Sequence, residues 1–143
     1  MTDSVSGILS VLQQELNTLE LVHSALEAES LGLSKGDVTS IQRLIQDKEA
    51  ALANHQRIMG QRPSASKEHA ANPEVAALQD RLAALASECR KLNQQNGIMI
   101  SKLSDRTKAA LNVLQGTEDM TVLYSASGVE AAKSKGSRVL GKA

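Results

Sequence analysis

The side chains that most often carry chemistry are few in this chain and stand far apart. The three histidines, His23, His55 and His69, fall on different predicted elements. His23 has Glu20 and Glu27 within reach on a helix, but a zinc site needs a cluster of three or four ligands. We therefore interpret this group as part of a solvated polar face, and we predict no metal site.

Cys89 is the only cysteine, so it cannot form an internal disulfide, which suits a reducing cytosol. A nucleophilic cysteine needs a base and an accessible position, whereas Cys89 falls among the apolar positions of a helix. We interpret it as a small buried hydrophobe. Glycine-rich phosphate loops and hydrolase serine motifs are absent, and the carboxylates are too dispersed for acid–base work. The sequence predicts neither an enzyme nor a cofactor.

The composition favours long helices. Of 143 residues, 41% are hydrophobic, yet Tyr124 is the only aromatic residue. Strands favour aromatic and β-branched residues, so β-sheet classes are excluded, and we predict an all-α protein. Sixteen basic and sixteen acidic residues balance, which argues against nucleic acid as a partner. No apolar run approaches the ~20 residues of a membrane span, and no basic leader begins the chain, so we expect a cytoplasmic protein without membrane insertion.

Apolar residues spaced by three and four predict three helices, over residues of about 3–31, 37–59 and 73–115. Gly32 would stop the first, Asp37 would cap the second, and Asn72-Pro73 would begin the third. The short link between the first two predicts an antiparallel hairpin, which packs on the long third helix as a three-helix, coiled-coil-like bundle over residues 1–116. Residues 60–72 are expected to form a flexible loop, and residues 117–143 a largely disordered tail that binds partners.

The third predicted helix is longer than the hairpin helices, so its C-terminal end should lack a partner helix. An exposed apolar stripe of this kind marks a protein-binding surface. Tyr124 in the tail either anchors a partner or covers the end of the helix. The residues predicted to bind a partner are Ile98, Met99, Leu103, Ala110, Leu111 and Leu114, with Met120, Val122 and Leu123 added when the tail folds.

Several short motifs resemble those of the FlgN family of flagellar export chaperones. They are an acidic first helix, Gly36-Asp37 at the start of the second helix with Lys48 in its middle, LNQQNG at residues 92–97, and YSASG at residues 124–128. The resemblance covers nearly the whole chain. In the family an aspartate often follows the tyrosine, whereas a serine follows Tyr124 here.

The resemblance implies a cytoplasmic escort of hook-associated proteins, which form the hook–filament junction. Such a chaperone prevents their premature assembly or degradation and delivers them to the export gate. It would bind the helical C-terminal regions of these proteins through the C-terminal part of the chain. Tyr124 matches the family's tail tyrosine, which is implicated in docking on the cytoplasmic domain of the membrane export gate.

Two other classes of protein fit parts of the pattern. A self-associating structural coiled coil would use every apolar stripe between chains, and Asn96 would then specify their register. A peripheral membrane helix would need a basic polar face, and the acidic first helix argues against it.

Overall fold

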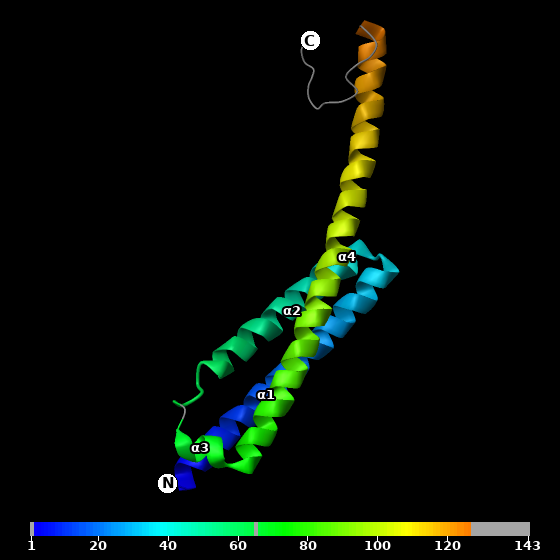
Figure 1. Ribbon diagram of the computed structural model, residues 1–143. Helices are drawn as coiled ribbons and strands as arrows, with labels where there is room; N and C mark the ends of the chain where they lie inside the picture. The colour runs from blue at the N-terminus through cyan, green and yellow to red at the C-terminus, as the bar shows by residue number, and fades with distance from the viewer. Residues whose placement is uncertain (1, 65, 127–143) are drawn as a thin grey trace. The chain divides into compact units, whose positions relative to one another are not determined.

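The fold is a set of four α-helices, seen in a computed structural model that describes the backbone of residues 2–64 and 66–126 and the side chains of residues 5–64 and 66–116. No strand occurs in this described part, which confirms the all-α class. The chain divides into two compact units, Met1–Ile100 and Ser101–Ala143. The helices are α1 (Thr2–Lys35), α2 (Val38–Met59), α3 (Lys67–Ala71) and α4 (Pro73–Ala126) (Figure 1).

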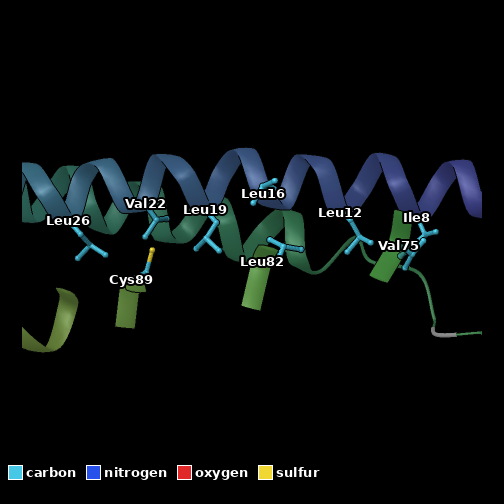
Figure 2. Packing of buried hydrophobic residues seen from close by; sticks show 9 residues of the cluster. All are labelled: Ile8, Leu12, Leu16, Leu19, Val22, Leu26, Val75, Leu82 and Cys89. Atoms are coloured by element: carbon cyan, nitrogen blue, oxygen red, sulfur yellow. The ribbon is translucent and has the colours of Figure 1, made fainter. Parts of the chain in front are cut away.

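The core of the first unit lies between α1 and α4. Figure 2 shows Val75 beside Ile8 and Cys89 facing Val22, so the two helices run in the same direction. Full burial of an aliphatic side chain of this size contributes roughly 1.5–3 kcal/mol, and six of the nine buried core residues come from α1. The buried members of the core are Ile8, Leu12, Leu16, Leu19, Val22, Leu26, Val75, Leu82 and Cys89.

The helix α1 ends at Lys35, and the predicted end at residue 31 is wrong. Gly36 takes a positive φ of 71°, the left-handed conformation that favours glycine. Its N–H donates to the carbonyls of Gly32 and Leu33 at 3.1 and 3.2 Å. Gly32 lies inside the helix, where a Cβ would collide with the side chain of Leu44 on α2. It therefore allows a close approach of the two helices instead of stopping the first.

Asp37 caps α2, as its position predicts. Its carboxylate accepts hydrogen bonds from the Ser40 hydroxyl at 2.6 Å and from the Ser40 backbone N–H at 3.4 Å. These bonds, led by that of the hydroxyl, lower the pKa of Asp37. The turn and the cap together reverse the chain, so that α2 returns along α1 in the predicted antiparallel hairpin.

The segment 60–72, predicted as a flexible loop, contains the short helix α3 and a contact to α1. Ser66 caps α3 by accepting the His69 N–H at 3.2 Å. This helix packs on α1, and His69 is buried. The serine, lysine and alanine residues of this stretch are typical of a loop. The capped turn with the buried side chain of His69 nevertheless forms a short helix there.

The helix α4 begins where the sequence places it and ends later. Asn72 accepts the N–H groups of Glu74 and Val75 at 2.9 and 3.1 Å. The helix then continues through Gly97 and past Gly116, where its end was predicted, to Ala126. A mid-helix glycine costs only about 1 kcal/mol, and among the described glycines only Gly36 has a positive φ. Residues 127–143 of the predicted tail lie outside the described residues.

Replacing Gly36 by alanine should lower the free energy of unfolding by about 1 kcal/mol, because an L-residue is strained at positive φ. Gly97→Ala is the matched control, since a Cβ there meets nothing within 4 Å and alanine is the better helix former. Urea denaturation of both variants should show shifts of opposite sign. Equal shifts would contradict the assignment of Gly36 as the helix terminator.

Candidate functional site

Three polar contacts hold α2 and the residues after it on α1. Lys48 Nζ lies 3.1 Å from Glu29 Oε2, and His55 Nδ1 lies 2.8 Å from Thr18 Oγ1. Beyond the end of α2, the Arg62 guanidinium makes a two-pronged ion pair with Glu15, one arm of which is the 2.8 Å bond from Nε to Oε1. This bond to Glu15 raises the pKa of Arg62.

Glu29 is the centre of a buried cluster that joins α1, α2 and α4. Its side chain is fully buried. Asn96 of α4 donates to Glu29 Oε1 and to the Leu26 carbonyl, both at 2.9 Å. Lys48 also donates to Asn93 Oδ1 at 3.1 Å. The two asparagines of the LNQQNG segment thus bind opposite ends of one ion pair, and they fix α4 against the hairpin.

His55 is buried against Thr18 in a neutral form. The single hydroxyl proton of Thr18 is donated to the Glu15 carbonyl at 2.9 Å, so His55 Nδ1 is the donor to Thr18 Oγ1. Burial lowers the pKa of His55 below its usual 6.5, and the nearby Glu15 opposes this shift only in part. The proton of the neutral ring therefore sits on Nδ1.

The residues singled out for chemistry lie apart. Cys89 is buried, as predicted, and burial raises the pKa of its thiol. His23 pairs with Glu27 at 3.4 Å on the surface of α1. Among the described residues, no three His, Cys, Asp or Glu side chains gather as metal ligands. None of the helices in the described part of the chain contains an apolar stretch that could span a lipid bilayer.

In the second unit, α4 carries an exposed apolar stripe. Successive residues of a helix are turned by about 100°, so Leu103, Ala110 and Leu114 share one face and Leu111 lies at its edge. Leu111 is 52% exposed and Leu114 is 64% exposed. Thr107 lies on the same face, and its hydroxyl donates to the Leu103 carbonyl at 3.0 Å. The threonine thus satisfies its own hydroxyl and leaves a methyl group for contact.

The other predicted binding residues divide between the first unit and the part without described side chains. In the first unit Met99 is half-buried, whereas Ile98 is 54% exposed and lies on the opposite side of α4 from the buried Asn96. Leu103 is half-buried and Ala110 is exposed in the second unit. Met120, Val122, Leu123 and Tyr124 belong to α4, but their side chains lie outside the described residues.

The buried polar groups were missed in the sequence. From the sequence, Glu15 and Glu29 are only members of an acidic first helix, yet both are buried, Glu15 paired with Arg62 and Glu29 paired with Lys48. A signal was present, because each acid stands next to the apolar stripe of α1. Lys48 and His55 also interrupt the apolar face of α2, and both side chains face the buried side of α1.

Comparison with known proteins gives consistent matches over nearly the whole chain. The sequence model of the FlgN family, described as FlgN protein, matches residues 1–132. The chain is 28% identical over 137 residues to the flagella synthesis protein FlgN of Salmonella typhimurium, which covers 94% of this chain and 95% of that protein. The protein of the same name from Salmonella typhi matches to the same extent. No solved structure matches the chain.

Replacing Lys48 by methionine should lower the free energy of unfolding by about 3 kcal/mol, because a buried carboxylate would lose its partner. The double variant Glu29→Met/Lys48→Met should regain most of this loss, since Asn96 keeps the Leu26 carbonyl. Arg43→Met, which breaks an exposed pair with Asp47, is the control and should change stability by less than about 0.5 kcal/mol. Chemical denaturation that gives equal losses for Lys48→Met and Arg43→Met would contradict the cluster's role.

The neutral His55 should make the fold less stable in acid. Because its folded pKa lies below the unfolded value of 6.5, its contribution is complete above 6.5 and is lost as the pH falls from 6.5 toward the folded pKa. His55→Gln keeps a donor for Thr18 and cannot titrate. Thermal melts from about pH 7.5 to pH 5 should therefore show a steeper acid decline for the natural protein than for His55→Gln. Parallel declines would show that His55 does not titrate on unfolding.

Proposed function

This chain belongs to the FlgN family, and from that premise we propose that it is a cytoplasmic export chaperone of flagellum assembly. The family and its Salmonella relatives, named flagella synthesis proteins, assign it a role in making flagella and do not describe an enzyme. In the proposal, the chain binds hook-associated proteins of the hook–filament junction, prevents their premature assembly or degradation, and delivers them to the export gate.

The exposed stripe of the second unit supports the client-binding part of the proposal. Leu111 and Leu114 expose more than half of their surface, and burying them against a partner releases the free energy of removing apolar area from water. An amphipathic helix is the shape that covers such a stripe. The helical C-terminal regions of the junction proteins would supply it, and Tyr124 would dock on the cytoplasmic domain of the membrane export gate.

The self-associating coiled coil is less well supported by the first unit. In that interpretation Asn96 sets the register between chains. Here Asn96 is fully buried and bonds to Leu26 and Glu29 of its own chain. The apolar residues of α4 from Val75 to Cys89 are likewise covered by α1 of the same chain. The apolar face of this part of α4 is therefore not available to a second copy of the chain.

Two substitutions should separate client binding from gate binding. Leu114→Glu places a charge in the stripe and should weaken binding of purified junction proteins at least about tenfold, which corresponds to about 1.4 kcal/mol. Tyr124→Ala should leave client binding unchanged and weaken binding to the cytoplasmic domain of the export gate. Calorimetry with each purified partner measures both effects.

Asn112→Glu is the matched control for the stripe variant. It adds the same side chain two residues away, on the opposite side of the exposed helix, and should leave both affinities unchanged. Circular dichroism should show the same helix content for all three variants. If Leu114→Glu and Asn112→Glu bind junction proteins equally well, the stripe is not the client surface.

A further inference from the structure

The charges beside the exposed stripe are distributed unevenly around the helix. Residues 101–116 contain three bases, Lys102, Arg106 and Lys108, and one acid, Asp105. At about 100° per residue, Arg106 lies about 60° from the centre of the stripe and Lys102 lies about 100° away on the same side. Lys108 and Asp105 are turned about 140° and 160° from the stripe. One edge of the stripe is therefore basic, and the acid lies on the back of the helix.

The basic edge is available to a partner. Lys102 and Arg106 are exposed, and no carboxylate in the described part of the chain forms an ion pair with either of them. In paired helices, residues that flank the apolar positions meet across the interface, and their charges select the partner. A partner with acidic residues at its own flanking positions would gain attraction here, whereas a basic partner would be repelled.

We propose that the stripe of Leu103, Ala110, Leu111 and Leu114 selects an amphipathic helix whose apolar face is flanked by acidic residues. The inference rests on the proposed function, because it takes the same stripe as the client-binding surface, and it adds the charge of the client helix. Ala110 in the middle of the stripe leaves room for a large aliphatic side chain of the partner. The described segment of 16 residues, about 24 Å long at 1.5 Å per residue, matches a partner helix of at least four turns.

The same charges disfavour a second copy as the occupant. A second copy would bring a stripe with the same excess of two positive charges over residues 101–116, which is three bases less one acid. Like charges at flanking positions destabilise paired helices. The distribution thus favours an acidic partner over self-association.

Two synthetic helical peptides test the selection directly. Both carry the same leucines at a three–four spacing, and one has glutamate and the other lysine at every flanking position. Fluorescence anisotropy with the full-length chain should give at least about tenfold tighter binding of the glutamate peptide at low salt. The preference should shrink as salt rises, because screening weakens exposed charge pairs. Equal affinities at low salt would overturn the proposal.

Arg106→Glu and Lys108→Glu form a matched pair of variants. Both reverse one exposed charge, but Arg106 lies beside the stripe and Lys108 lies on the back. Arg106→Glu should reduce the preference for the glutamate peptide several-fold more than Lys108→Glu does. Equal reductions would mean that only the net charge acts, and the proposal of an edge that selects its partner would fail.

The same measurements keep this inference distinct from the proposed function. If Leu114→Glu weakens junction-protein binding while the two peptides bind equally, the chaperone proposal stands and the charge selection falls. If the glutamate peptide is preferred while junction proteins bind Leu114→Glu normally, the acidic-helix surface stands and the client assignment falls. Sedimentation that shows a dimer dissolved by Leu114→Glu would make a second copy the occupant, and would overturn the proposal.

Discussion

The arrangement of the first unit depends on one buried carboxylate. Glu29 has no access to water, so its charge must be matched by partners brought from other helices. Lys48 comes from α2 and Asn96 from α4, and both reach it only when the helices are in a single register. Stripes of leucine and alanine would pack almost as well after a slip of one heptad. The polar cluster excludes that slip, since it would leave a charge buried without a partner.

The two units use their side chains in different ways. In the first unit, the Asn93 and Asn96 amides, the His55 ring and the Arg62 guanidinium all bind groups of the same chain. The second unit leaves leucines and bases exposed on its helix. The proposed export chaperone would need both properties, because it would have to remain folded without its client and still offer an apolar surface to bind it.

The sequence predicts those structural features that depend on a local pattern of residues. It does not predict features, such as a helix end, that depend on a contact between residues far apart in the chain. The three–four spacing of apolar residues places the long helices, and Asn72-Pro73 places the start of α4. The choice between Gly32 and Gly36 as the end of α1 depends on φ and on the approach of Leu44, which no local pattern contains. Gly116 resembles a terminator equally well and is not one.

The candidate site shows the same difference between features set by a local pattern and features set by distant contacts. The positions of the exposed stripe follow from periodicity and from the greater length of the third predicted helix. The buried roles of Glu15 and Glu29 do not, because acids on a helix are usually solvated. Only the polar residues beside or within the apolar faces of two helices, the acids of α1 and Lys48 of α2, would have indicated them, and Arg62 lies beyond the end of α2.

The parallel pairing of α1 with α4 also sets an order of events during synthesis. The contact of Asn96 with Leu26 spans 70 residues. At a synthesis rate of about 5–20 residues per second, Asn96 is therefore made about 4–14 s after the apolar face of α1 that α4 covers. The contacts of α1 with the rest of the hairpin span only 19, 37 and 47 residues and close sooner, at a lower entropic cost. The emerging chain therefore first holds a hairpin joined by these polar pairs and by apolar residues of α2 such as Ile41 and Leu52, and the part of the α1 stripe that α4 covers stays open to water until α4 leaves the ribosome.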